Sequence, residues 1–162
     1  MLLAALACVD PTPDGLPPAE KTAFSCELGT DGPDGFATLD ALGTLELHMG
    51  FQGFLLFVVR ARALEEAPAL VDATVAATFD GEDRTSVVQP RVPFEDGAVT
   101  DEILVFITAN WLSYYVGREA EVSLRAESEG AYCTATGTAT MVDEDPCVHT
   151  GDEPLCPEDT GG

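Results

Sequence analysis

Residues 45–63, LELHMGFQGFLLFVVRARA, form the densest apolar run in the chain. From Leu45 to Phe51 apolar and polar residues alternate, which is the pattern of a strand with one buried face. The GFQG segment predicts a bend or bulge, because glycine adopts backbone angles that other residues avoid. The FLLFVVRARA segment predicts a second strand. We expect the core to form around these two strands.

The second of these strands is apolar on both faces over its first half. Residues 102–108, EILVFIT, have the same character. A strand that faces water on one side should be polar there. The second faces are therefore either covered, by residues 29–43 or by the NWLSYYVG connection, or they form an interaction surface for a partner or a second copy. That surface would consist of Phe54, Leu56, Val58, Leu104 and Phe106.

Length and charge limit the possible functions. The 162 residues and the polar tail predict one domain, and no apolar run approaches the roughly 18 residues of a membrane span. The formal net charge of −22 opposes binding to nucleic acid, because phosphates would be repelled. It also opposes unassisted binding to anionic lipid. We expect the acidity to serve solubility.

The amino terminus, MLLAALAC, is typical of the end of a secretory signal. Its last six residues resemble the lipobox of bacterial lipoproteins, although Ala5 stands where that family prefers leucine. The resemblance implies that Cys8 becomes the lipidated first residue of the mature protein. Residues 1–7 are then the remnant of a signal whose beginning lies upstream. Residues 8–21, rich in Pro, Asp and Gly, are expected to be a flexible tether that holds the domain off the membrane.

The remaining chain predicts an all-β domain over residues 22–142. Short strands are separated by turn signals such as Asp80-Gly81, and residues 119–127 alternate cleanly between apolar and polar positions. Pro90 and Pro93 predict that residues 86–94 form an edge strand. No segment has a helical period of useful length. We expect an antiparallel immunoglobulin-like β-sandwich of about seven to eight strands, followed by an acidic tail over residues 143–162.

The strand order, with the GFQG turn ahead of a long core strand, resembles the immunoglobulin-like domains of uncharacterised secreted lipoproteins from myxobacteria-like bacteria. The resemblance covers roughly residues 22–142 and rests on a weakly specific motif. It implies a single β-sandwich domain and no activity.

The chain has five cysteines, and four remain if Cys8 carries lipid. An even number in an exported chain predicts two disulfides. In immunoglobulin-like sandwiches the first and last strands often run side by side, so that fold implies a bond between Cys26 and Cys133. Cys147 and Cys156 would then close a small loop in the tail. A zinc site is disfavoured because no two cysteines have CxxC spacing.

The residues that could take part in catalysis or ligand binding do not predict a reaction. His48 and Glu46 share an outward strand face, and no nucleophile motif accompanies them. The DGPDG and DEDP clusters lack the alternating ligands of a calcium loop and are expected to be turns and tail. Trp111, Tyr114 and Tyr115 either form a platform for a sugar or protein or close the end of the domain.

These observations predict a non-catalytic lipoprotein of the bacterial cell envelope, exported and lipid-anchored to a membrane facing the periplasm or the cell surface. Its role is structural or binding, with an envelope protein or a glycan as partner. No cofactor, metal or nucleic acid is expected, and the membrane is contacted only through the lipid. The alternatives are a calcium-dependent adhesion module and a small secreted hydrolase.

Overall fold

The computed structural model describes residues 21–144, apart from residues 51–53, 96–97 and 108–110. Strands dominate this part of the chain, so the predicted all-β class is confirmed. The elements in chain order are β1 (Thr22–Ala23), β2 (Cys26–Gly32), β3 (Gly35–Thr38), α1 (Leu39–Leu42), β4 (Thr44–Met49), β5 (Leu55–Ala63), β6 (Leu70–Phe79), β7 (Glu82–Glu95), β8 (Val99–Thr100), β9 (Ile103–Ile107), α2 (Leu112–Tyr115), β10 (Glu119–Glu127) and β11 (Ala131–Asp143).

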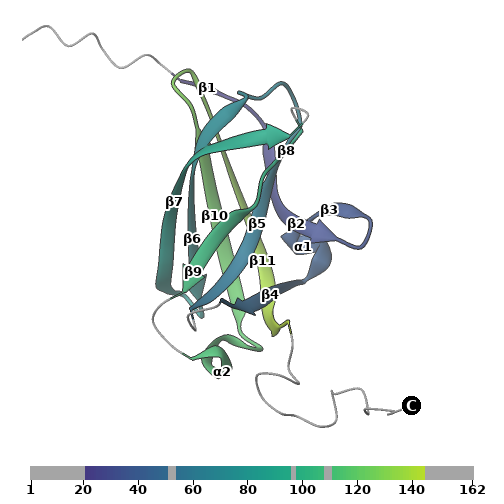
Figure 1. The fold of residues 1–162 in the computed structure, drawn as a ribbon, viewed down its shortest axis with the longest axis vertical. Coiled ribbons are helices and arrows are strands. Elements are labelled where there is room, and N and C mark those ends of the chain that lie inside the picture. Colours follow the sequence, from purple (N-terminus) through teal and green to yellow (C-terminus); the bar gives the residue numbers. More distant parts are fainter. Residues whose placement is uncertain (1–20, 51–53, 96–97, 108–110, 145–162) are drawn as a thin grey trace, which may run out of the picture.

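The strands close into a seven-stranded barrel, so the predicted sandwich is wrong (Figure 1). The order around the ring is β11, β10, β6, β7, β8, β5 and β4, and β4 returns to β11. β4 closes the ring because it pairs antiparallel with β5, at Met49 and Leu55, and parallel with β11, at Leu45 and Met141. A sandwich and a barrel both bury every second residue of a strand, so the alternating pattern does not distinguish them.

Apolar side chains fill the inside of the barrel. The predicted inward face of residues 55–63 is confirmed, since Phe57, Val59 and Ala61 are all fully buried. The clean alternation of β10 is confirmed as well. Four of the residues that face inward from β6 and β10 are alanines, Ala73, Ala77, Ala120 and Ala126, which leave room for the larger side chains around them. The buried residues of β5, β6, β9 and β10 are Leu55, Phe57, Val59, Ala61, Val71, Ala73, Val75, Ala77, Phe79, Ile103, Val105, Ile107, Ala120, Val122, Leu124 and Ala126.

β6 and β7 form a hairpin whose far end is bent. Asp80 and Gly81 both have positive φ, 53° and 80°, so the predicted turn is confirmed as a two-residue hairpin loop. The register then shifts opposite Pro90 and Arg91, where Arg91 has a φ of 57° and its N–H donates to Asp72 Oδ1 at 3.0 Å. This bulge turns β7 toward β8. The strand pairs with β6 along one side, and on its other side the described residues pair only at Phe94 and Glu95, with β8. The edge position that the prolines predict is therefore confirmed for residues 86–93.

Side chains, rather than a backbone ladder, join β7 to β9. No backbone pairing between these two strands is present in the described part of the chain. The amide of Gln89 takes the place of a missing peptide group: its Nε2 donates to the carbonyl of Glu102 at 3.1 Å, and its Oε1 accepts from the N–H of Leu104 at 3.2 Å. The hydroxyl of Thr85 donates to the carbonyl of Phe106 at 2.6 Å. The outer edge of β9 is thereby satisfied without a partner strand.

On the opposite wall β2 fills the space between β5 and β11. β2 pairs with β5 but shares no backbone ladder with β11, and a disulfide between Cys26 and Cys133 makes that link. The two Cα atoms are 6.0 Å apart, so the predicted pairing of these cysteines is confirmed. The bond holds two segments separated by 107 positions in the sequence.

The short helix α1 closes the same wall lower down. Leu39 is fully buried and packs on Gly137 of β11, where a Cβ atom would lie 3.0 Å from the Leu39 Cβ. The neighbouring Asp40 accepts from the N–H of Thr138 at 2.7 Å, so its carboxylate satisfies an edge amide of β11 that no strand reaches. Thr38 caps the helix by accepting from the N–H of Ala41 at 3.3 Å.

The barrel has two distinct ends. β1 and the amino-terminal side lie at one end, whereas α2 lies at the other, beside the start of β5 and the end of β4 (Figure 1). The predictions for residues 1–20, including lipid at Cys8 and the tether, concern residues outside the described part of the chain. The same holds for the tail from residue 145 and the predicted bond between Cys147 and Cys156.

Candidate functional site

The outer faces of β5 and β9 carry the apolar residues that the sequence singles out. The two strands are antiparallel neighbours, with Leu56 opposite Phe106 and Val58 opposite Leu104. Phe54 is 47 % exposed and Phe106 is 43 % exposed, whereas the other three side chains are half-buried. We call these residues the apolar patch: Phe54, Leu56, Val58, Leu104 and Phe106.

The three residues of the predicted aromatic platform differ in their burial. Trp111 stands at the start of α2 and is 86 % exposed. Tyr114 is half-buried, and the guanidinium of Arg118 lies 4.0 Å from the centre of its ring. Tyr115 is fully buried, with its ring centre 4.9 Å from that of Phe79. Tyr115 therefore closes the end of the core, and Trp111 presents a free ring to solvent.

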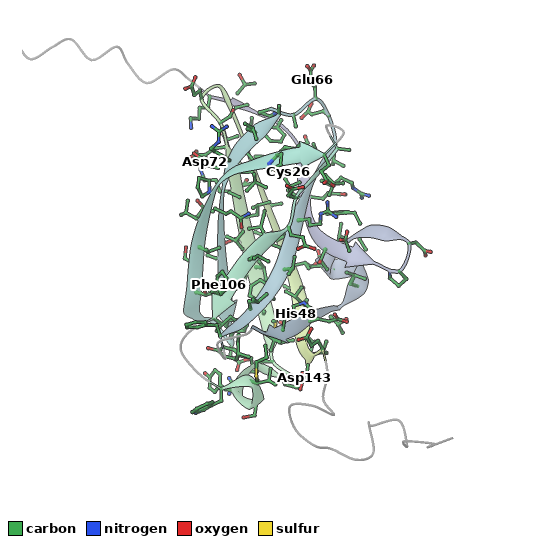
Figure 2. All side chains as sticks on the ribbon, viewed as in Figure 1. Cys26, His48, Glu66, Asp72, Phe106 and Asp143 are labelled. Atoms are coloured by element: carbon green, nitrogen blue, oxygen red, sulfur yellow. A yellow bond between two sulfur atoms is a disulfide. The ribbon has the colours of Figure 1, made fainter. Side chains whose placement is uncertain are left out.

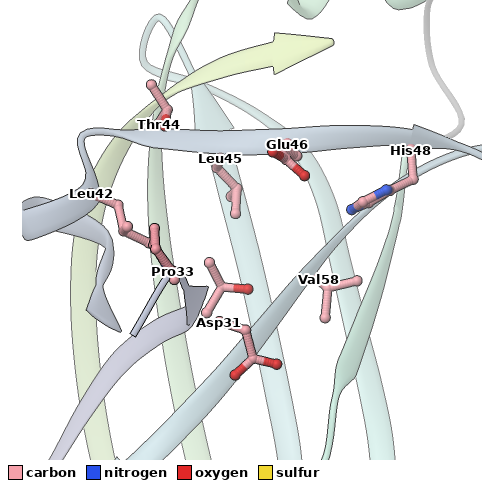
Figure 3. Close-up of a pocket in the computed structure, with 10 residues that line it drawn as sticks. Asp31, Pro33, Leu42, Thr44, Leu45, Glu46, His48 and Val58 are labelled. Atoms are coloured by element: carbon pink, nitrogen blue, oxygen red, sulfur yellow. The ribbon is translucent and has the colours of Figure 1, made fainter. Parts of the chain in front are cut away.

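A hollow of about 420 Å³ lies beside the apolar patch (Figure 3). Its upper wall in the figure is β4, with Glu46 and His48 directed into it. The β2–β3 hairpin and α1 contribute the opposite wall, and Val58 of β5 contributes one side. Apolar contacts come from Leu42, Leu45, Pro33 and Val58, and polar ones from Thr30, Asp31, Thr44, Glu46 and His48. Apolar and polar side chains thus line the hollow together, and two carboxylates, those of Asp31 and Glu46, are among them.

The hairpin that makes this wall is held by Arg60, which projects from the outer face of β5. Its guanidinium donates to both carboxylate oxygens of Asp31, at 2.9 and 3.0 Å, and to Glu95 at 3.0 Å. Its Nε donates to the carbonyl of Thr100 at 2.7 Å. Burial opposes the charge, but the hydrogen bonds and charges of Asp31 and Glu95 outweigh it and raise the pKa of Arg60. One guanidinium therefore serves two carboxylates, those of Asp31 and Glu95.

The imidazole of His48 is paired as well. Its Nδ1 contacts Glu144 Oε2, and the other oxygen of Glu144 accepts from the N–H of Met49 at 3.2 Å. Glu144 is the first residue after β11, so this contact ties the end of the last strand to β4. Within the described residues Glu144 is the hydrogen-bond partner of His48, and no hydroxyl or thiol joins the pair. The arrangement orients an imidazole but places no nucleophile beside it.

Glu46 differs from Asp31 and His48, the other two ionisable residues that line the hollow. Its side chain is exposed and forms no hydrogen bond or ion pair with any described residue. The sequence places Glu46 and His48 correctly on an outward strand face, yet it does not predict the hollow. The hollow depends on the β2–β3 hairpin, whose turn is predicted by DGPDG but whose position against β4 is not.

Among the residues that the structure covers, no group of three or more His, Cys, Asp or Glu side chains is arranged to hold a metal ion. No helix in the same residues is long and apolar enough to cross a membrane. The carboxylates and hydroxyls of the hollow can instead accept or donate hydrogen bonds to an organic ligand.

The fold and this surface define a closed all-β barrel that carries an apolar patch beside an acidic hollow. Comparison with known proteins finds no matching family model, no matching curated protein and no matching solved structure.

Proposed function

We propose that this chain is a non-catalytic binding module of the bacterial cell envelope, anchored by lipid at Cys8, and that it binds a protein through the apolar patch. The observation that carries the proposal is the exposure of Phe54 and Phe106 on the outer face of a barrel whose interior is already filled. Large apolar side chains that gather outside a complete core usually mark an interaction site.

The position of the patch supports an outward-facing role. Figure 2 places Phe106 toward the α2 end of the barrel, whereas β1, the strand that follows the proposed tether, lies at the opposite end (Figure 1). An anchor attached ahead of β1 would leave the α2 end directed away from the membrane. This geometry favours a partner in the periplasm or outside the cell over the lipid surface itself.

The anchor is tested by detergent partitioning of the protein expressed with a complete secretory signal. The wild type should enter the detergent phase, and Cys8→Ser should remain in the aqueous phase. Equal partitioning of the two proteins would refute lipidation at Cys8.

The binding role is tested by quantitative capture from envelope extract with wild type, Leu56→Ser and Phe106→Ser. Val88→Ser is the matched control, because Val88 is 63 % exposed on β7, outside the patch. We expect a protein that wild type and Val88→Ser retain and the two patch variants lose, while all four keep similar melting temperatures. Identical retention by all four proteins would refute the patch as a binding surface.

A glycan is a second candidate partner, favoured by the open ring of Trp111. Sugars stack on exposed indole rings, and such stacking changes indole fluorescence. Trp111 is the only tryptophan in the chain, so a titration with soluble cell-wall fragments reports on this ring alone. An unchanged emission spectrum would argue against a glycan at this position.

A further inference from the structure

The apolar patch and the hollow are parts of one continuous surface. Strand register places His48 of β4 opposite Leu56 of β5, and Leu56 opposite Phe106 of β9. Val58 belongs to both features, since it lines the hollow and lies opposite Leu104. A chain segment lying across β4, β5 and β9 would therefore touch the hollow and the patch at neighbouring positions. We call this surface the β4–β5–β9 groove: the hollow together with the apolar patch.

The charge available to a ligand in this groove is negative. Asp31 shares the single charge of Arg60 with Glu95, and Glu144 is hydrogen-bonded to His48, whose ring is charged only when it is protonated. Glu46 has no hydrogen bond or ion pair within the described part of the chain, so its carboxylate is available to pair with an incoming cation. The formal net charge of −22 adds a long-range attraction for cations.

The apolar part of the lining favours a cationic group that carries an aliphatic stem. Leu42, Leu45 and Val58 line the same hollow as Glu46. Lysine and arginine side chains bury an aliphatic stem along apolar surface and keep the charged head at its margin. The volume of about 420 Å³ is ample for such a side chain.

A second copy of this chain is a poor occupant. Two copies would each bring a formal charge of −22 to the contact. Several of the cations in the described residues are also engaged in ion pairs within their own chain: Lys21, Arg60, Arg62, Arg118 and Arg125. Charge complementarity favours a different protein with basic residues at its contact.

We propose that the β4–β5–β9 groove binds a peptide segment in which a lysine or arginine lies next to large apolar residues. The basic side chain enters the hollow and pairs with Glu46, while the apolar side chains cover Leu56 and Phe106. The inference rests on the proposed function, because it names the chemistry of the protein that the patch would bind.

The test uses four capped peptides of the form acetyl-Gly-Leu-X-Phe-Gly-amide, in which X is lysine, arginine, norleucine or glutamate. Norleucine keeps the aliphatic stem and removes the charge. Binding to the full chain is followed by amide chemical shifts in NMR titrations. We expect the lysine and arginine peptides to bind about 3- to 10-fold more tightly than the norleucine peptide, the range of a partly exposed ion pair. The glutamate peptide should bind most weakly, and added salt should reduce the difference.

Two variants locate the effect on the chain. Glu46→Gln preserves shape and removes the charge, so it should abolish the preference for lysine over norleucine. The matched control is Glu66→Gln, because Glu66 is also exposed but lies at the β1 end of the barrel (Figure 2). It should leave the preference unchanged. If both variants reduce the preference equally, the attraction is a general effect of net charge and the inference is wrong.

The remaining outcomes separate this inference from the proposed function. If lysine and norleucine peptides bind equally and Leu56→Ser weakens both, the patch binds protein but the basic-residue preference is refuted. If propylamine or propylguanidinium alone binds as tightly as the peptides, the hollow takes a small amine and the peptide assignment fails. Absence of any peptide binding at millimolar concentration refutes the inference, while the capture experiment with the patch variants still decides the proposed function.

Discussion

Removal of the disulfide between Cys26 and Cys133 should be among the most damaging changes to the stability of this barrel. The bond joins segments 107 positions apart and links β2 to β11 where no backbone ladder connects them. In the chain-entropy model a loop of this length contributes about 4.7 kcal/mol at 25 °C. Domains of this size have total stabilities of roughly 5–15 kcal/mol, so the loss would be a large share of the whole.

The experiment compares urea unfolding of the wild type with that of the double variant Cys26→Ala/Cys133→Ala. Wild type under reducing conditions is the control, because it keeps the sulfur atoms of Cys26 and Cys133 in place and lacks the bond between them. We expect both proteins to be strongly destabilised, and the alanine variant slightly more, because it also removes the buried sulfur of Cys133. The difference between the two would measure the packing of that sulfur.

Hydrogen exchange adds a local measurement. Without the bond, β2 is held to the barrel by its pairing with β5 and by the ion pair of Arg60, so amides of the β2–β3 hairpin should exchange faster than those of β10. A loss of stability below about 1 kcal/mol, with unchanged exchange in the hairpin, would refute the idea that the disulfide substitutes for a missing ladder.

Three further changes test the wall and its charges. Gly137→Ala should cost about 1–3 kcal/mol in urea unfolding because the new Cβ would meet Leu39 at 3.0 Å, whereas Gly130→Ala, with nothing within 4 Å, should cost far less. Asp40→Ala should cost about 1 kcal/mol and speed hydrogen exchange of the β11 amide that it binds; unchanged exchange there would contradict the bond. Hydrogen bonds from Arg125 and then Lys21 lower the pKa of Glu127 below 4.5, so its contribution to stability is present above pH 4.5 and lost as the pH falls. Glu127→Gln should therefore be less stable than wild type near neutral pH, and the difference should shrink as the pH falls through the lowered pKa of Glu127; a constant difference in urea midpoint would contradict this.

Much of the local structure could be predicted because it depends on neighbouring residues. The alternation of residues 119–127 identifies β10 and its inward face, and Asp80-Gly81 identifies the hairpin turn. The two apolar faces of residues 55–63 were also correctly assigned, with Phe57 inside and Leu56 outside. In each case a period of two or a residue tolerant of positive φ is sufficient.

Closure of the barrel could not be predicted in this way. It depends on the parallel pairing of β4 with β11, and nothing in either strand records the identity of its partner. The helices α1 and α2 have four residues each, too few to show a helical period. The hydrogen bonds of Gln89 and Asp40 to strand edges could not be predicted either, because polar residues of this kind are ordinarily expected to face solvent.

In the candidate site, too, the local features could be predicted and the contacts between distant segments could not. The patch residues lie on the outer faces of two strands, β5 and β9, and each outer face could be identified from the alternation along its own strand. The hollow requires the β2–β3 hairpin to lie against β4, which Arg60 and the disulfide arrange through contacts distant in sequence. Glu46 could therefore be placed on a surface but not in a binding groove.

The pairing of β11 has a consequence for the order in which the chain can fold. β11 pairs with β10, with β4 and with β1, so three strands that are made earlier each lack one neighbour until residues 131–143 have been made. Contacts between such distant segments slow folding, because the intervening chain must be closed into a loop first. Until then β4 and β10 each expose a free edge, the kind of surface on which unfinished β-proteins associate with one another. A chain truncated before β11 should therefore aggregate rather than form a smaller stable domain. During synthesis, the free edges of β4 and β10 need to be shielded until β11 has been made.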